Sequence, residues 1–251
     1  MILQDRDRHL LRELAVMRVI DREQAKRVAG FGSTTRANYR LLLLTRAGFL
    51  RRFFLGTVGG ARKGIYALSP KGAALVDVPY RGPRRATNQT LAGDLFTAHQ
   101  LRINEIFCLV KYEAIPVVDA RFVCWLSFYE PLHSGIPLIP DGYAEVAGPA
   151  KHLAMFLEVD LGNEGRTVWL RKVQSYVRYA MSGKFNEQFH QPQFRTLVVA
   201  NSERRLQSLR SVTATVSDKI FWFTTFEQIN RNGFWSDIWK RPTGDLRQPL
   251  I

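Results

Sequence analysis

The 251-residue sequence predicts an α+β protein in two parts, and two observations predict it. The first part shows three short amphipathic helical patterns followed by a β-hairpin. The second part follows the order helix, three strands, helix, strand, which is typical of an α/β domain with an αβββαβ core. The expected boundaries are residues 1–78 for the first domain, 79–90 for a basic linker and 91–251 for the second domain.

Three helices are expected in the first domain from their apolar spacing and their capping residues. Residues 5–16 place leucines on one face and acidic residues in the first turn. Asp21 and Gln24 form the pattern of a capping box in front of the second helix. Ser33 is the expected cap of the third helix, which should end at Gly48 because glycine favours the left-handed conformation at a helix end.

A hairpin and a short helix complete the first domain. Residues 49–54 and 64–68 have strand composition and flank a glycine-rich turn, with Arg62 and Lys63 at its basic tip. Pro70 occupies the first position of the short helix. Three helices followed by a hairpin is the order of a winged helix-turn-helix, a fold that binds DNA.

Basic residues concentrate in the first third of the chain. The net charge is +14, and residues 1–90 contain 18 Lys and Arg against 6 Asp and Glu, whereas residues 91–251 contain 18 against 16. Localised positive charge favours a polyanion as partner, because Lys and Arg displace the counterions condensed on phosphates. A solubilising surface is the other interpretation. The coincidence with the helix-turn-helix pattern favours double-stranded DNA.

The residues expected to read DNA lie at the start of the third helix, since that part of a helix-turn-helix enters the major groove. Arginine suits guanine and asparagine suits adenine, whereas serine and threonine suit phosphates or bases. Each residue taken alone fits equally well on the polar face of a core helix, so the prediction concerns the group. The predicted DNA-binding residues are Thr34, Thr35, Arg36, Asn38, Tyr39, Arg40, Arg62 and Lys63.

Residues 77–90 are rich in proline, arginine and polar residues. They are interpreted either as a solvated linker or as a basic arm along a phosphate backbone. The second domain then begins with a helical pattern. Its expected helices span residues 91–112, 166–181 and 202–214, and its expected strands span residues 120–128, 137–146, 153–159, 195–200 and 219–224.

Three carboxylates are expected near one edge of the second domain's sheet. Asp141 precedes one strand, and Glu158 and Asp160 share one face of the next because residues two apart in a strand point the same way. Such a group predicts a Mg²⁺ or Mn²⁺ site of hard oxygen ligands, able to assist phosphodiester cleavage. A structural ion-pair network with Lys172 or Arg171 is the equal alternative, because buried carboxylates need partners.

Other classes of site are not indicated by the sequence. The five histidines lack zinc-ligand spacing, no P-loop pattern is present, and Cys108 and Cys124 are expected as buried thiols. We therefore expect no small-molecule cofactor. The sequence also shows no signal peptide and no apolar run long enough for a membrane span, so no membrane partner and a cytoplasmic location are expected.

The chain resembles the replication-relaxation family of plasmid and mobile-element proteins. The resemblance rests on DRDRHLLRELAVMRVIDREQAKRV, RLLLLTRAGFLRR and IYALSPKGAALV, and then on His99, PDGYAEV, FLEVDLGNE and KVQSYVRY. It covers most of residues 5–182. It implies a DNA-binding protein concerned with plasmid replication or topology.

The second domain also resembles the PD-(D/E)XK nuclease superfamily. Asp141 matches the first acid of that pattern and Glu158 the second, whereas Asp160 stands where the pattern has lysine. The superfamily's lysine helps to position or activate water, and Lys172 on the following helix is the residue expected to substitute for it. The resemblance therefore implies a nuclease-like fold, with Asp141, Glu158, Asp160 and Lys172 as its catalytic residues if it cleaves.

Three functions follow from these patterns. The leading hypothesis is a DNA-binding protein of a plasmid or mobile element that reads duplex DNA through its winged helix. The second is a metal-dependent DNA endonuclease that uses Asp141, Glu158 and Asp160. The third is a transcriptional regulator whose second domain forms a homodimer, since winged-helix proteins often act as dimers.

Overall fold

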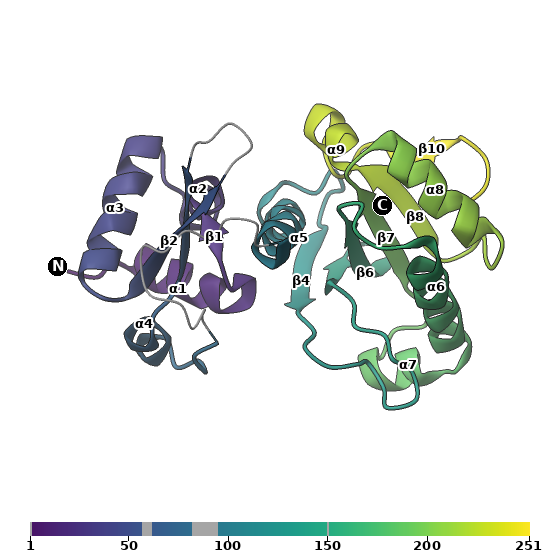
Figure 1. Ribbon diagram of the computed structural model, residues 1–251, viewed down its shortest axis with the longest axis horizontal. Coiled ribbons are helices and arrows are strands. Elements are labelled where there is room, and N and C mark those ends of the chain that lie inside the picture. The colour runs from purple at the N-terminus through teal and green to yellow at the C-terminus, as the bar shows by residue number, and fades with distance from the viewer. Residues whose placement is uncertain (1, 57–61, 82–94, 150) are drawn as a thin grey trace. The chain divides into compact units, whose positions relative to one another are not determined.

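The computed structural model describes residues 2–56, 62–81, 95–149 and 151–251, which fold as two compact units, Met1–Tyr112 and Glu113–Ile251. Figure 1 shows the helices and strands of both units, and each unit has its own sheet, as expected of an α+β protein. Among the described residues, no helix combines the length and the apolar character that a membrane span requires.

The first unit contains five helices and a three-stranded sheet within its described residues. The strands pair in the order β1-β3-β2, and the hairpin of β2 and β3 runs in register from Leu50 opposite Leu68 to Gly56 opposite Arg62. The elements are α1 (Asp5–Met17), β1 (Ile20–Asp21), α2 (Arg22–Ala29), α3 (Thr34–Arg46), β2 (Leu50–Gly56), β3 (Arg62–Leu68), α4 (Pro70–Leu75) and α5 (Leu95–Tyr112). The three predicted helices and the hairpin are confirmed, and the two-residue strand β1 is an addition.

The predicted caps fix where these helices begin. The side chains of Asp21 and Ser33 accept hydrogen bonds from backbone N–H groups three residues later, which satisfies donors that lack a partner inside the helix. Ser69 caps α4 in the same way and is an addition to the predicted caps. Gly48 ends the turn after α3 with φ of +78°. In α4, a Cβ added to Gly72 would lie 2.1 Å from the carbonyl oxygen of Phe49, so only glycine permits this close approach.

Helix α5 belongs to the first unit, although the sequence-based boundary at residue 91 assigns it to the second. The side chain of Asn104 donates to the carbonyl oxygens of Met17 and Val19 at 3.0 and 2.6 Å. Gln24 donates to the carbonyl oxygen of Leu101 at 2.7 Å. These polar contacts join α5 to α1 and α2. They cannot be predicted from the spacing of apolar residues along the sequence. Most of the predicted linker, residues 82–90, lies outside the described residues.

The second unit is built on a seven-stranded sheet with the order β10-β9-β8-β7-β6-β5-β4. Strands β4, β5 and β6 are antiparallel, whereas β6, β7 and β8 are parallel. The elements are β4 (Arg121–Leu126), β5 (Gly142–Ala147), β6 (His152–Asp160), α6 (Arg166–Met181), α7 (Lys184–Phe189), β7 (Arg195–Ala200), α8 (Glu203–Ala214), β8 (Phe221–Thr225), α9 (Phe226–Asn232), β9 (Trp239–Lys240) and β10 (Arg247–Gln248).

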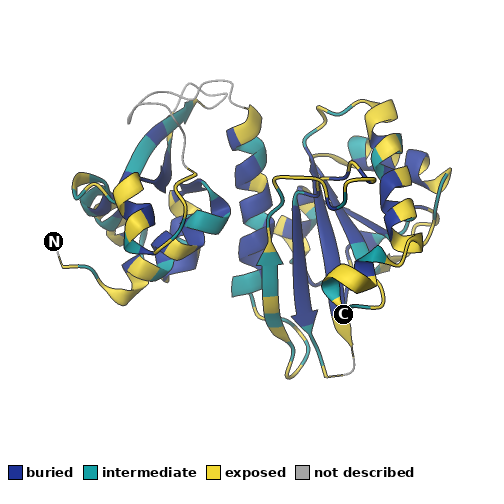
Figure 2. Ribbon diagram, turned by 90° about the horizontal axis from the view of Figure 1, so that it is seen from below, coloured by how far each residue is buried: buried dark blue, intermediate teal, exposed yellow. Residues whose placement is uncertain are grey.

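The core of this unit lies between the sheet and the helices α6, α7 and α8. Figure 2 shows the central strands almost wholly buried. Phe156 on β6 packs with Tyr176 of α6 and Phe185 of α7. Residues two apart on a strand share a face, so Glu158 and Asp160 continue the row of Phe156 beneath the same helices. The apolar pattern of β6 thus brings two carboxylates under α6 and α8.

The structure adds elements that the sequence patterns did not indicate. Strands β9 and β10 and helices α7 and α9 are short, and short elements show little periodicity. Their aromatic residues are part of the fold, since Phe234 and Trp239 are fully buried. Cys108 is buried, as predicted, whereas Cys124 is half-buried, and both are free thiols.

Candidate nucleic-acid interface and carboxylate cluster

The first candidate site is the exposed face of α3. Ala37, Leu41 and Leu44 fill the buried face of this helix. The opposite face exposes four of the predicted DNA-binding residues, which are Thr35, Arg36, Asn38 and Tyr39. Tyr39 is 63% exposed, so its ring and hydroxyl are accessible on this face. Hydrogen-bond donors and an aromatic ring therefore stand together on one helix surface.

Two other predicted DNA-binding residues of α3 contact the protein itself. The guanidinium group of Arg40 binds both carboxylate oxygens of Asp7, with Nε 2.7 Å from Oδ1, and Asp7 is fully buried. Arg40 also donates to the carbonyl oxygen of Ile2 at 2.8 Å. The hydroxyl of Thr34 accepts a hydrogen bond from Lys26 at 3.2 Å. Arg40 thus fastens α3 to the start of α1.

Near the hairpin tip, the structure describes only the residues that end β2 and begin β3. Arg62 and Lys63 open β3 and are exposed, while the turn of residues 57–61 lies outside the described residues. The ammonium group of Lys63 lies 2.5 Å from Oδ2 of Asp21, the residue that caps α2. A phosphate contact by Lys63 would therefore compete with this ion pair.

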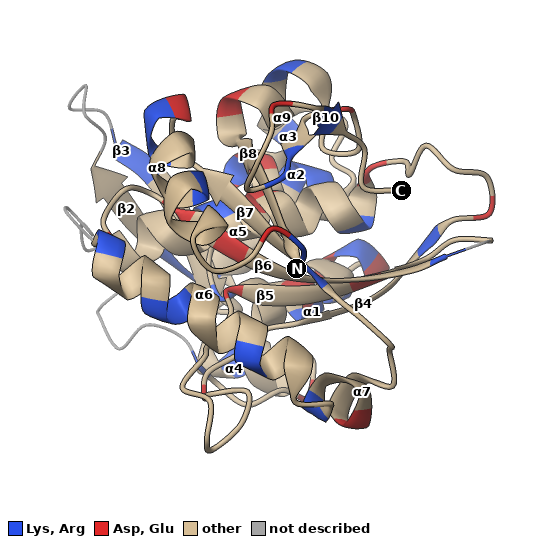
Figure 3. Ribbon diagram, turned by 90° about the vertical axis from the view of Figure 1, so that its right-hand side faces the viewer, with Lys and Arg blue, Asp and Glu red and all other residues tan. Residues whose placement is uncertain are grey.

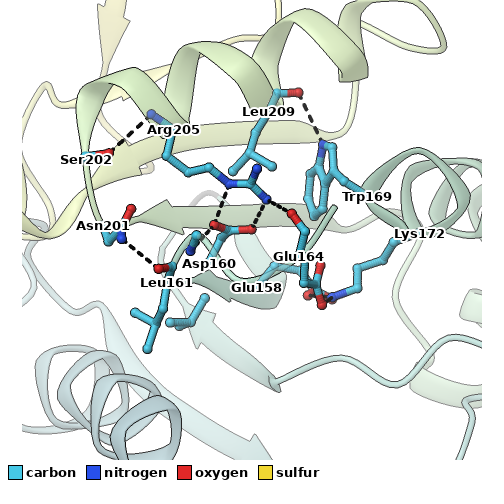
Figure 4. A network of polar contacts seen from close by, with 12 residues as sticks. Glu158, Asp160, Leu161, Glu164, Trp169, Lys172, Asn201, Ser202, Arg205 and Leu209 are labelled. Carbon is cyan, nitrogen blue, oxygen red and sulfur yellow. Dashed lines mark hydrogen bonds and ion pairs between the residues drawn. The ribbon is translucent and has the colours of Figure 1, made fainter. Parts of the chain in front are cut away.

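The second candidate site is the carboxylate cluster of the second unit, shown in Figure 4. Glu158 is almost fully buried, and its two oxygens are engaged by Lys172 Nζ at 2.8 Å and by the Tyr176 hydroxyl at 2.6 Å. Lys172 also contacts Glu164 at 3.0 Å. Asp141 lies on the neighbouring strand end, where Oδ2 accepts the N–H of Val159 at 2.7 Å.

Asp160 has a different partner from Glu158. Both of its oxygens lie 2.7 Å from the guanidinium nitrogens of Arg205, which comes from α8. Oδ1 also accepts the backbone N–H of Gly162 at 2.7 Å. Arg205 extends the network by donating to the carbonyl oxygen of Glu164 at 2.7 Å (Figure 4). This is a two-pronged arginine–carboxylate pair, the strongest kind of side-chain ion pair.

Burial dominates the electrostatics of this cluster. It raises the pKa of Glu158 to about 7, and the negative charge of Asp141 adds to the effect, while Lys172 opposes it. Burial also lowers the pKa of Lys172, but Glu158, Asp141 and Glu164 together outweigh it and leave the lysine pKa raised. The cluster therefore holds a charged lysine firmly among acidic groups.

The three predicted metal ligands do not form one metal site in the structure. Among the described residues there is no group of three or more His, Cys, Asp or Glu side chains that could hold a metal ion. Arg205 binds both oxygens of Asp160, and Lys172 and Tyr176 bind those of Glu158. This arrangement fits the ion-pair alternative with Lys172, and we derive no metal-dependent step from it. Binding of Mg²⁺ or Mn²⁺ stays a prediction.

Three residues of the network were missed by the sequence analysis. Tyr176 follows Lys172 by four residues, a spacing that places both on one helix face, so this signal was available. Arg205 and Glu164 gave no such signal, because their partners lie on other elements. Arg205 lies 45 residues from Asp160, and Glu164 lies eight residues from Lys172, a spacing that no helix or strand period indicates.

Comparisons with known proteins give one finding. A model of the replication-relaxation family matches residues 11–191, which is more than half of the chain. Neither the curated proteins nor the solved structures contain a match. The matched range includes the exposed face of α3 and the residues Asp141, Glu158, Asp160 and Lys172, whereas Arg205 lies beyond it.

Proposed function

The chain belongs to the replication-relaxation family, and from this membership we propose that it binds double-stranded DNA in the replication or transfer of a plasmid or other mobile element. The order of three helices and a hairpin in the first unit supports a winged helix-turn-helix as the binding module. In this assignment α2 and α3 form the helix-turn-helix, and the hairpin of β2 and β3 forms the wing.

The exposed face of α3 is the observation that carries this proposal. Arg36 and Asn38 can donate hydrogen bonds to base edges in the major groove, and Thr35 can donate to a base or a phosphate. Tyr39 offers an exposed ring and hydroxyl beside them. Arg40 is bound to Asp7 and orients the helix, so this proposal assigns base reading to the exposed residues.

The net charge of the first unit supports the same partner. Residues 1–112 contain 20 Lys and Arg against 8 Asp and Glu. Such an excess attracts phosphates at long range, which gives affinity for any duplex before bases are read. A first unit of this charge is expected to bind duplex DNA without strong sequence preference at low salt and more selectively at higher salt.

A gel-shift assay of the full chain tests this proposal with random-sequence duplex DNA at low salt. Arg36→Ala combined with Asn38→Ala should weaken binding at least about tenfold, since a positive charge and a hydrogen-bond donor are lost from the surface that contacts the phosphates. Arg46→Ala is the matched control, because Arg46 is exposed at the opposite end of the same helix. Failure of the wild-type chain to bind duplex DNA would reject the proposal.

One contact favours DNA cleavage as a second candidate function. Lys172 meets Glu158 beside Asp141, as expected if a helix lysine replaces the strand lysine of the PD-(D/E)XK pattern. The pairing of Asp160 with Arg205 argues against a three-carboxylate metal site. We expect cleavage, if present, to require Asp141 and Lys172.

A nicking assay on supercoiled plasmid DNA, with Mg²⁺ or Mn²⁺ added, separates the two functions. Cleavage by the wild-type chain that is lost in Asp141→Ala, with duplex binding retained, would establish the endonuclease. Binding without nicking under either metal ion would leave DNA binding as the activity. Sedimentation of the same samples tests the third alternative, a regulator that dimerises through its second unit.

A further inference from the structure

A basic pocket lies at the end of the second unit's sheet where the parallel strands begin. His152 and Arg195 are the first residues of β6 and β7, and Trp222 is the second residue of β8. Asp160 ends β6, so the carboxylate cluster occupies the opposite end of these strands. The pocket has a volume of about 710 Å³, within the range of small-ligand sites.

The side chains that line this pocket carry one sign of charge. Lys151, Arg195, Lys219 and Arg241 line it, and the described lining includes no Asp or Glu side chain. Helix α7 of the same unit, by contrast, carries both a basic and an acidic residue (Figure 3). Four cationic groups around one concave space produce a strongly positive potential there.

Two of these four basic side chains lie close to the same aromatic ring. The guanidinium carbons of Arg195 and Arg241 lie 4.4 and 4.7 Å from the centroid of Trp222. Burial lowers the pKa of Arg195, and the charge of Arg241 lowers it further. The two like charges repel each other, and an anion bound beside both would offset this repulsion.

The protein groups that these two arginines contact neutralise little of their charge. Arg195 donates to the carbonyl oxygen of Leu250, and Arg241 donates to those of Asp218 and Lys219. Carbonyl oxygens orient a guanidinium group but carry no net charge, and each group has five N–H donors. The carboxylate of Asp218, which is not among the lining residues, partly offsets the charge of Arg241.

His152 also lines the pocket, and its contact with Glu145 fixes the orientation of its ring. Its Nε2 lies 2.7 Å from Oε2 of Glu145, and Glu145 also accepts the hydroxyl of Tyr143 at 2.6 Å. Gln191, another lining residue, contacts the same carboxylate at 3.4 Å. Glu145 is thereby engaged by two lining residues and by Tyr143, and the ring of His152 is held at the pocket wall.

We propose that this pocket binds a phosphate group through Arg195 and Arg241, with Lys151 and Lys219 at its mouth. Arginine suits phosphate because its planar fork of donors matches two phosphate oxygens at once. The Trp222 ring keeps both forks in place by stacking. The proposal is independent of duplex binding by α3, because every residue that it uses lies in the second unit.

Isothermal titration of the full chain at low salt tests the proposal with four probes. They are inorganic phosphate, thymidine monophosphate, and tetrathymidylate with and without a 5′-phosphate. Preference for the phosphorylated over the unphosphorylated oligonucleotide indicates a strand end, equal binding of both indicates backbone phosphates, and binding of only the two small probes indicates a free ligand. Each of these outcomes supports phosphate recognition, and no binding of any probe overturns it.

The variants decide whether the pocket is the site. Arg195→Gln and Arg241→Gln should each weaken binding at least about tenfold, since a charge-assisted hydrogen bond is lost. Arg231→Gln is the matched control, because Arg231 is exposed on α9 and paired with Glu227. If either pocket variant loses its fold by circular dichroism, Lys151→Gln combined with Lys219→Gln decides, since both lysines are exposed. Affinity unchanged in that double variant would overturn the proposal.

Discussion

The two units use their basic residues differently. Residues 1–112 contain 20 Lys and Arg against 8 Asp and Glu, whereas residues 113–251 contain 16 against 14. In the second unit, buried Glu158 and Asp160 bind Lys172 and Arg205. In the first unit a buried acid binds Arg40, while Arg36 on the same helix is exposed. The buried carboxylates thus hold Arg40, Lys172 and Arg205 within the fold, whereas Arg36 is exposed on the surface of α3.

Arg40→Ala should have the largest effect on stability. It leaves the fully buried carboxylate of Asp7 without its cation, which typically costs about 3–5 kcal/mol. Urea unfolding of the full chain should show this loss. Arg36→Ala is the control on the same helix and should stay within about 0.5 kcal/mol of wild type. Equal stability of the two variants would remove the distinction between these arginines.

Arg205→Met should have the next largest effect, a loss of about 3 kcal/mol, because Asp160 would be buried without its partner. Methionine preserves the apolar stem of the arginine, so the loss reports mainly on charge. Arg204→Met tests the neighbouring exposed position and should be nearly neutral. An unchanged free energy of unfolding in Arg205→Met would mean that Asp160 is hydrated or has another hydrogen-bond partner.

Glu158 should make the stability of the chain pH-dependent. Burial raises its pKa from the ordinary 4.5 to about 7, so the folded chain retains a proton that the unfolded chain releases. This contribution is fully present below about pH 4.5 and is lost as the pH rises to about 7. Between pH 5 and 7, wild type should lose roughly 1 kcal/mol per pH unit more than Glu158→Gln. Parallel pH profiles of unfolding free energy would contradict this assignment.

The sequence predicted most regular elements, because their signals are local. Asp21 and Ser33 cap helices through residues three positions away, and α6 and β7 have the predicted bounds. The sequence-based boundary assigned α5 to the second domain, whereas in the structure this helix belongs to the first unit. Its Asn104 binds the carbonyl oxygen of Met17, 87 residues earlier in the sequence. Contacts between residues so far apart in the sequence do not affect the local spacing of apolar residues.

The sites were predictable only in part, for the same reason. The spacing of Glu158 and Asp160 correctly placed them on one face of β6, and Lys172 was correctly placed near Glu158. The partner of Asp160 was not foreseen, because Arg205 comes from α8. The roles of Arg36 and Arg40 are equally hidden in the sequence, since only the fold reveals that Asp7 faces one and not the other.

The salt dependence of duplex binding tests the central claim most directly. The full chain and Arg36→Ala should be titrated with labelled duplex DNA at several salt concentrations. We expect the logarithm of the wild-type association constant to fall linearly with the logarithm of salt concentration. Arg36→Ala should lower the affinity, with a slope smaller by about 1 if Arg36 contacts a phosphate. Identical affinities and slopes for the two proteins would contradict the claim that α3 binds DNA through its exposed face.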